Sequence, residues 1–476
     1  GRIIPIYSLT GNLTNSEMIR IMSNAISSHI SSIKEKLPED LRDELDLMPI
    51  EEAIRNIHFP ESRDHYIRAR RRLVFEELLI LQLGLFLIKS RTKELYRGIK
   101  FPPDNEVYSF INRLPFKLTD AQMRVFKEIE KDMESEEQMN RLVQGDVGSG
   151  KTIVAVLAML KAWRAGYQSV MMAPTEILAT QHYESVSNFL KDYDINIKLL
   201  IGSISSREKE EILRGLKEGS IDILIGTHAV IQDKVEFFRL GLAITDEQHR
   251  FGVKQRAILS QKGDNPDILV MTATPIPRTL GLILYGDLDI SIIDELPPGR
   301  KQIETIAVGT NMIDRVNAFV KKQILTGRQA YIVTPLIEEN ETMDLQSADE
   351  LYRKLKDDVF SEFRVGLLHG KMRPSEKDEV MEKFAKGELD ILVSTTVIEV
   401  GVNVPNANIM VIHNAERFGL AQLHQLRGRV GRGEYQSYCI LINGSNSRIS
   451  RERMRILQKS TDGFYISEKD LELRGP

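Results

Sequence analysis

A glycine-rich segment at residues 145–152 limits the fold of this chain more than any other feature. Its sequence, GDVGSGKT, fits the pattern G-x4-G-K-[ST] and lies between an apolar run at 141–144 and an apolar helical pattern at 153–165. Glycines allow backbone N–H groups to turn inward around phosphates, and the amino end of a following helix favours negative charge. This order of strand, loop and helix predicts a nucleotide-binding sheet of parallel strands.

The residue types in this loop predict a site for ATP and Mg²⁺. We expect Lys151 to reach the β- and γ-phosphates and Thr152 to coordinate Mg²⁺ through its hydroxyl. The residues expected to surround the phosphates with them are Gly145, Asp146, Val147, Gly148, Ser149 and Gly150. An ordinary glycine turn is the alternative, and the flanking strand and helix patterns argue against it.

Two adjacent carboxylates follow a second apolar run, Leu240–Thr245. Asp246 is expected to hold Mg²⁺ through a water molecule, and Glu247 to orient and deprotonate the attacking water. At the carboxyl end of a parallel strand, both would lie beside the phosphate loop. Two acidic residues alone would indicate a strand-end cap or a solvated turn, but a phosphate loop in the same chain favours a catalytic pair.

A third segment, QLHQLRGRVGRG at 422–433, places three arginines among glycines. Arginines and glycines do not form a hydrophobic core, and the planar guanidinium group is suited to binding phosphate oxygens. If two sheets face each other, Arg429 and Arg432 would contact the γ-phosphate held by the first, and hydrolysis would depend on closure of the lobes. A basic surface patch is the alternative interpretation.

The spacing of apolar residues divides the chain into five parts. Residues 1–14 are a short extended piece that resembles the tail of another domain, and 15–115 have helical spacing with breaks at prolines. Residues 116–298 and 299–445 each alternate short apolar runs with amphipathic stretches, which predicts two successive α/β lobes with parallel sheets. Residues 446–476 are charged and helical.

Composition indicates a soluble globular protein. Apolar residues make up 42% and charged residues 28%, and no apolar run reaches the ~20 residues of a membrane span. The single cysteine, Cys439, fits a reducing compartment, so we expect a cytoplasmic protein without a membrane partner. The net charge of −4 still allows DNA binding through a local groove.

These segments together resemble the motifs of superfamily 2 helicases. The matching stretches are 118–122, 173–181, 202–203, 226–229, 272–275, 369–370 and 394–401, with the phosphate loop, the acidic pair and the arginine segment. Three longer stretches, DEQHRFGV from Asp246, MTATPIPR from Met271 and AERFGLAQLHQ from Ala415, are similar to the RecG family of bacterial ATP-dependent DNA helicases.

The resemblance implies two tandem RecA-like lobes in a double-stranded DNA translocase. Such a motor remodels branched DNA by reversing stalled forks and migrating Holliday junctions, in recombination and repair. It implies forked DNA and single-stranded DNA-binding protein as partners, and a monomer. It also makes 1–14 the tail of an OB-type wedge domain, 15–115 a helical linker, and 446–476 the start of a helical hairpin that transmits lobe closure to DNA.

The resemblance also assigns roles to single residues. Gln122 would read adenine, and Gln248 would join the catalytic group. The residues expected to couple hydrolysis to movement are His249, Thr272, Thr274 and Gln425. Those expected to grip DNA phosphates are Thr175, Ser203, Thr227, His228, His369, Thr395 and Thr396. Asn403 departs from the pattern, because many relatives have Asp there, which weakens an expected ribose contact.

Three other functions fit parts of the sequence. A transcription-repair coupling motor is the nearest, but Gln248 and the helical stretch before Phe116 favour the RecG family. A nucleotide-dependent switch would not need Glu247 or the arginines, and a metal nuclease using Asp246, Glu247 and His249 would leave the phosphate loop unexplained. The basic cluster at 68–72 is expected to form a solvated face or ion pairs with Glu76 and Glu77 rather than to bind DNA.

Overall fold

The computed structural model describes residues 3–95, 97–246, 258–273, 288–297, 301–335, 350–395, 404–431, 433 and 435–474. The chain forms two compact units, Gly1–Thr92 and Lys93–Pro476. Within the described ranges, every helix is either too short or too polar to span a bilayer.

The first unit is helical, as the apolar spacing predicts. Its elements are α1 (Asn15–His29), the 3-10 turn η1 (Ile30–Ser32), α2 (Glu39–Glu44), α3 (Ile50–His58) and most of α4 (Arg63–Leu95). Thr14 begins α1 with a capping box, in which its hydroxyl accepts from the N–H of Glu17 and the Glu17 carboxylate accepts from the N–H of Thr14. This pairing satisfies two N–H groups that a helix otherwise leaves unbonded.

Arg72 on α4 is completely buried in this unit. Its guanidinium forms ion pairs with Glu35 at 2.5 Å and Glu76 at 2.6 Å, which satisfies a charge that would otherwise be costly to bury. Arg68, on the same helix, pairs with Asp46 at 3.3 Å. The predicted ion pairing is therefore confirmed for Arg72 and Glu76, while the second partner is Glu35 rather than Glu77.

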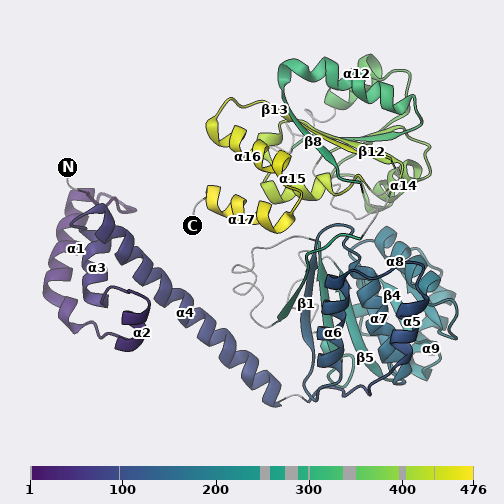
Figure 1. The fold of residues 1–476 in the computed structure, drawn as a ribbon, viewed down its shortest axis with the longest axis horizontal. Coiled ribbons are helices and arrows are strands. Elements are labelled where there is room, and N and C mark those ends of the chain that lie inside the picture. Colours follow the sequence, from purple (N-terminus) through teal and green to yellow (C-terminus); the bar gives the residue numbers. More distant parts are fainter. Residues whose placement is uncertain are drawn as a thin grey trace. The chain divides into compact units, whose positions relative to one another are not determined.

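The second unit begins with a lobe built on a seven-stranded sheet (Figure 1). Its strands follow the order β3-β4-β2-β5-β6-β1-β7, and every pair is parallel. The elements are α5 (Glu106–Arg113), α6 (Asp120–Met133), β1 (Asn140–Gly145), α7 (Lys151–Arg164), β2 (Gln168–Met172), α8 (Glu176–Phe189), β3 (Ile197–Leu200), α9 (Ser206–Glu218), β4 (Ile223–Gly226), η2 (His228–Ile231), β5 (Leu240–Asp246), β6 (Asp267–Thr272) and β7 (Asp289–Ile293).

A second lobe follows, with a parallel six-stranded sheet in the order β10-β11-β9-β12-β13-β8. Its elements are β8 (Glu304–Gly309), η4 (Thr310–Met312), α12 (Ile313–Ile324), β9 (Gln329–Val333), the π-helical η5 (Lys354–Val359), β10 (Val365–Leu368), α14 (Pro374–Ala385), β11 (Ile391–Ser394), β12 (Ala407–Ile412), η6 (Ala415–Arg417), α15 (Leu420–Arg427) and β13 (Tyr438–Asn443). The two predicted parallel α/β lobes are thus confirmed.

Both sheets are covered on both faces. Successive side chains of a strand point to opposite sides of the sheet, so neighbours on one strand pack into different apolar clusters. On β1, Val143 packs into one apolar cluster with α6 and α7, whereas Leu142 packs into a separate cluster with α9. On β9, Tyr331 and Ile332 divide in the same way between the two clusters of the second lobe. The continuous apolar runs in the sequence follow from this two-sided burial.

Two helices close the described chain, α16 (Arg448–Lys459) and α17 (Gly463–Arg474). Met454 and Leu457 of α16 and Ile466 of α17 are buried in the core of the second lobe, in the same cluster as Leu423 and Leu426 of α15. The hairpin that they form is thereby fixed to the helix that carries the start of the arginine segment. The prediction of a helical hairpin after the second lobe is confirmed.

Candidate nucleotide and DNA sites

The phosphate loop and Asp246 lie at the same edge of the first sheet. β6 lies between β1 and β5, and the register pairs Gln144 with Thr272 and Asp246 with Met271. The carboxyl ends of the three strands therefore coincide, which brings Asp246 and the buried Thr272 to the level where the phosphate loop begins. Sequence reasoning predicted this juxtaposition of the loop and the first acidic residue from the strand pattern.

Two glycines give the loop its shape. Gly148 and Gly150 have φ angles of 80° and 82°, a left-handed conformation that residues with a Cβ rarely adopt. A Cβ on Gly150 would also lie 2.2 Å from Nε2 of Gln122, so this position requires glycine on both grounds. Lys151 begins α7, and its Nζ donates to the carbonyl oxygens of Gly145 at 2.8 Å and Asp146 at 3.1 Å.

Gln122 supports the loop from α6. Its Nε2 donates to the carbonyl of Ser149 at 2.8 Å, and its Oε1 accepts from the N–H of Thr119 at 2.9 Å as part of a capping box. The side chain is buried, so its amide holds the loop against the start of α6. The sequence suggested a contact with adenine at this position, and this structural contact with the loop was not foreseen.

Asp246 is held by a histidine that sequence reasoning missed. Nε2 of His182, on α8, lies 2.8 Å from Oδ2 of Asp246, and both residues are buried. An ionised carboxylate only accepts hydrogen bonds, so the ring N–H of His182 donates. This bond fixes the orientation of the Asp246 carboxylate at the end of β5. The two residues come from separate strand–helix units, so no short motif joins them in the sequence.

The arginine segment of the second lobe touches the phosphate loop. Nε2 of His424, on α15, lies 2.7 Å from Oδ1 of Asp146 in the loop. Four residues later, Gly428 faces Val147 so closely that a Cβ on the glycine would lie 3.0 Å from the valine Cβ. The contact between the two segments is therefore close-packed and includes a partly buried hydrogen bond.

The pKa of Asp146 reflects this contact. Burial by itself raises the pKa, but the hydrogen bonds from His424 and from the N–H of Val147, together with the charge of Lys151, hold the pKa below its usual value. The carboxylate is therefore ionised at neutral pH and accepts from His424. Sequence reasoning placed Asp146 among the residues around the phosphates but did not foresee its partner.

Arg427 connects the same segment to the carboxyl end of α16. It is 2% exposed, and it donates to the carbonyls of Leu457 at 2.7 Å and Ser460 at 2.8 Å and to Nδ1 of His424 at 2.7 Å. Since Nδ1 of His424 accepts, the ring proton sits on Nε2 and is donated to Asp146. One neutral histidine thus links the phosphate loop to the buried arginine and, through it, to the hairpin.

Arg429, assigned to the γ-phosphate, follows two residues later and is 7% exposed. Gln425 lies half-buried on α15, and Thr152 lies half-buried in the first turn of α7. The hydroxyl of Thr152 and the carboxylate of Asp246 are hard oxygen donors, which fit Mg²⁺. Among the described residues, no three His, Cys, Asp or Glu side chains form a metal-binding cluster by themselves.

The first-lobe residues assigned to DNA gather at the other half of the same sheet edge. Thr175, Ser203 and Thr227 follow β2, β3 and β4, which are neighbours in the sheet, and His228 begins η2. Glu176 organises this edge, because its two carboxylate oxygens accept from the N–H of Gly202 and from Oγ of Ser203, both at 2.8 Å. This organising residue was not singled out from the sequence.

In the second lobe, His369 and Thr395 follow the neighbouring strands β10 and β11. The N–H of Thr395 donates to the carbonyl of Leu368 at 3.2 Å, which holds the two strand ends together. Thr395 is completely buried, so its side chain is not open to a DNA phosphate in this conformation. The other predicted site residues lie outside the described ranges: Glu247, Gln248, His249, Thr274, Thr396, Asn403 and Arg432.

The fold and site define a two-lobed nucleotide-dependent helicase of superfamily 2. Residues 119–283 match the family model described as DEAD/DEAH box helicase, and residues 312–434 match the helicase conserved C-terminal domain. The chain is 52% identical over 475 residues to the ATP-dependent DNA helicase RecG of Bacillus subtilis, and covers 70% of that protein. It is 51% identical over 476 residues to the RecG of Thermotoga maritima, and covers 61% of it.

The structure agrees with this relationship. A solved structure described as RecG bound to a three-way DNA junction superposes on the whole chain with a TM-score of 0.85 and 48% identity, and the chain covers 63% of it. The chain therefore belongs to the RecG family of ATP-dependent DNA helicases, as the resemblance of its motifs predicted. It spans between about three fifths and seven tenths of the length of these relatives.

Proposed function

We propose that this chain is the motor of an ATP-driven double-stranded DNA translocase that remodels branched DNA, reversing stalled forks and migrating Holliday junctions. The observation that carries the proposal is the contact between the arginine segment of one lobe and the phosphate loop of the other, through His424 and Asp146. A nucleotide at this loop would be shared by both lobes. Hydrolysis would then be tied to their relative movement, as a motor requires.

In this proposal each lobe supplies a different part of the chemistry. The loop and Lys151 bind the phosphates, Thr152 and Asp246 hold Mg²⁺, and Gln122 contacts adenine. When bound, the metal ion neutralises charge on the phosphate oxygens. Glu247 and Gln248 position and deprotonate the attacking water, and Arg429 and Arg432 stabilise the charge that develops on the γ-phosphate.

Residues at the strand ends around this centre are proposed to couple hydrolysis to movement and to contact DNA. His249, Thr272, Thr274 and Gln425 transmit the state of the nucleotide between the lobes. The residues proposed to contact the DNA backbone are Thr175, Ser203, Thr227, His228, His369, Thr395 and Thr396. Small polar side chains at loops suit this role, because phosphate contacts hold DNA without reading its sequence. For Thr395 the role requires a rearrangement that exposes its buried side chain.

The working form that we propose is a cytoplasmic monomer. Its substrate is forked or branched DNA, and single-stranded DNA-binding protein is a further partner. The RecG name of the relatives and the three-way junction in the related structure support branched DNA as the substrate. Sedimentation of the protein with and without a fork would test the monomer.

ATP turnover with and without forked DNA tests the motor. Lys151→Ala should abolish turnover while leaving the fold and its circular dichroism unchanged, because the phosphates lose their principal cation. Near-normal hydrolysis by this variant would remove the basis of the loop assignment. Shortened or nicked strands on a gel would instead indicate a nuclease, and a basal rate that no DNA changes would indicate a switch.

Arg432→Ala tests the second lobe. We expect ATP binding to persist while turnover falls by ~10³-fold or more, which is the usual contribution of an arginine that stabilises transition-state charge. Lys383→Gln, an exposed residue of α14 far from the arginine segment in sequence, is the matched surface control. Weaker nucleotide binding with full turnover at saturating ATP would contradict the assigned role of Arg432.

A further inference from the structure

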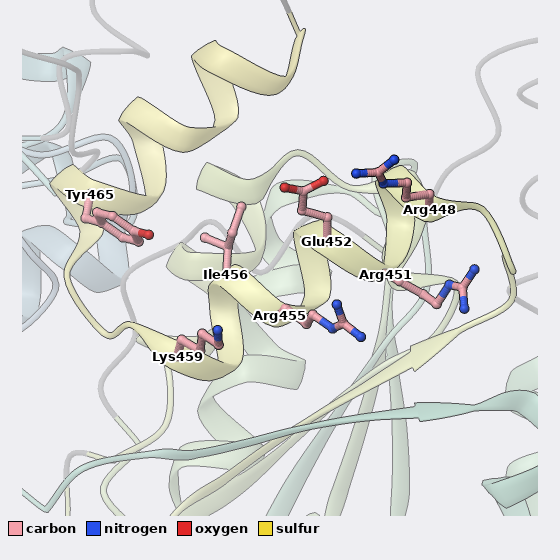
Figure 2. A pocket seen from close by; sticks show the side chains of 7 residues that line it. All are labelled: Arg448, Arg451, Glu452, Arg455, Ile456, Lys459 and Tyr465. Carbon is pink, nitrogen blue, oxygen red and sulfur yellow. The ribbon is translucent and has the colours of Figure 1, made fainter.

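The outer face of α16 carries a stripe of basic side chains that the catalytic proposal does not use. Arg448, Arg451, Arg455 and Lys459 are exposed, and we call them the α16 stripe. Spacings of three, four and four residues place them within about 80° of one another around a helix. With Tyr465 from the start of α17, they line an open groove of about 500 Å³ (Figure 2).

The buried and exposed faces of this helix are clearly divided. Met454 and Leu457 pack into the core, and Arg453 turns inward to donate to the carbonyls of Glu416 and Phe418. The helix therefore cannot rotate without breaking buried contacts, and the stripe is held facing outward. Its charges are fixed in a row rather than scattered on flexible loops.

The stripe has no partner within the part of the chain that the structure describes. None of its four side chains forms an ion pair or hydrogen bond with a described residue, although Glu452 lies within the same groove. On α14, by contrast, two exposed lysines are paired, Lys383 with Glu379 and Lys386 with Glu382, both at 2.6 Å. Unpaired cations in a row are a feature of surfaces that bind a polyanion.

The local charge is also unusual for this chain. The sequence of α16, RISRERMRILQK, has five basic residues and one acidic residue, a net charge of +4, in a chain whose net charge is −4. A local excess of this kind attracts phosphates through space and is screened by salt. The partner should therefore be an extended anion rather than a single small ion.

We infer that the α16 stripe binds consecutive phosphates along one strand of duplex DNA. From Arg448 to Lys459 the stripe is roughly 16 Å long, an axial length over which one strand of a duplex presents about five phosphates. Because the strand winds around the axis, the straight stripe would face only some of these phosphates. Arginine also suits the planar, two-oxygen recognition of phosphate. This inference rests on the proposed function, and it assigns a specific contact surface for the DNA outside the strand-end residues.

The position of the stripe supports duplex DNA over other polyanions. Its helix is joined by Arg427 to the segment that touches the phosphate loop. A DNA contact on α16 would therefore be mechanically linked to the nucleotide site. An acidic protein segment would gain nothing from this linkage, whereas a translocated duplex would.

The test is the salt dependence of binding to a blunt duplex of about 30 base pairs, measured by fluorescence anisotropy without nucleotide. The variant is Arg451→Gln/Arg455→Gln/Lys459→Gln, and the control is Lys321→Gln/Lys383→Gln/Lys386→Gln, which removes the same number of charges from ion-paired lysines. Each lost phosphate contact lowers the slope of log K against log salt by ~0.9, so the stripe variant should lose ~2–3 in slope and roughly 10²–10³-fold in affinity near 0.1 M salt.

An unchanged slope in the stripe variant, or an equal loss in the control, would overturn the inference. The inference would also fail if the stripe variant lost binding to a poly-glutamate peptide but still bound the duplex, since that result identifies an acidic protein as the partner. Basal ATP hydrolysis without DNA should be the same in all three proteins. If the unaltered protein hydrolyses ATP and its rate rises with DNA, the proposed function stands and only the stripe is at issue; if DNA has no effect on it, the proposed function itself fails.

Discussion

Replacement of Arg427 by alanine should release the carboxyl end of α16 from the arginine segment. The guanidinium donates to two carbonyls at that end, of Leu457 and Ser460, and to His424. Hydrogen bonds from a charged donor contribute about 1.5–3 kcal/mol each, so losing the two carbonyl bonds should cost ~3–6 kcal/mol of local stability. Arg427 makes no hydrogen bond to the described strands of the first sheet, so the change should leave that sheet intact.

Amide hydrogen exchange of α16 measures this loss directly, because exchange reports the free energy of local opening. At about 1.4 kcal/mol per factor of ten, the amides of α16 should exchange roughly 10²–10⁴-fold faster in Arg427→Ala. The strands of the first lobe, such as β1, should exchange as before. Arg455→Ala, an exposed position on the same helix, is the matched control and should leave α16 protected.

The same variant has a functional readout. If Arg427 joins the hairpin to the nucleotide site, basal ATP hydrolysis should persist while its stimulation by duplex DNA falls. Arg427→Lys keeps the charge but cannot span both carbonyls and His424, so it should be only a partial rescue. Unaltered exchange of α16 in Arg427→Ala would refute the energetic argument. Accelerated exchange with full DNA stimulation would refute the coupling.

Two further predictions concern buried ionisable groups. Burial lowers the pKa of His413 to about 4, so its neutral form stabilises the fold above its unfolded pKa near 6.5, and this contribution is lost as pH falls towards 4. Glutamine does not titrate, so the free energy of unfolding of His413→Gln should rise relative to that of the unaltered protein by up to about 3 kcal/mol as pH falls from 7 to 4. A difference between the two proteins that does not change with pH would contradict this. Burial raises the pKa of Asp267 well above its usual value, although its carboxylate accepts from the N–H of Met139. The protonated form of Asp267 stabilises the fold, and this contribution is lost as pH rises. Asparagine stays neutral, so Asp267→Asn should raise the melting temperature more at about pH 8 than at about pH 5, and the opposite order would contradict the raised pKa.

The elements around the site were largely predictable because their signals are local. A glycine-rich loop between an apolar run and a helical pattern specifies one strand–loop–helix unit, and β1 and α7 form there. Parallel strands bring their carboxyl ends to one edge by geometry, so the closeness of Asp246 to the loop followed from the order of elements. Capping at Thr14 and Thr119 is local in the same sense.

The contacts that fix the site were not predictable in this way. His182 and Asp246 lie on different strand–helix units, and His424 and Asp146 lie in different lobes. No periodicity or motif spacing encodes which titratable side chain meets another across a sheet. The assignment of Thr395 to DNA failed to anticipate its burial for a related reason, since a polar residue at a strand end can face inward as easily as outward.

The chemistry of His424 explains how a signal can pass from the phosphate loop to α16. A neutral imidazole has one N–H and one lone pair, and here the N–H is donated to Asp146 while the lone pair accepts from Arg427. Movement of Asp146 when phosphates enter the loop would therefore displace the ring, and the ring cannot move without disturbing the guanidinium that holds the end of α16. Asparagine at position 424 is too short to replace both ring nitrogens, and lysine has no acceptor. The proposed coupling thus depends on a residue that can donate and accept on opposite sides of a rigid ring.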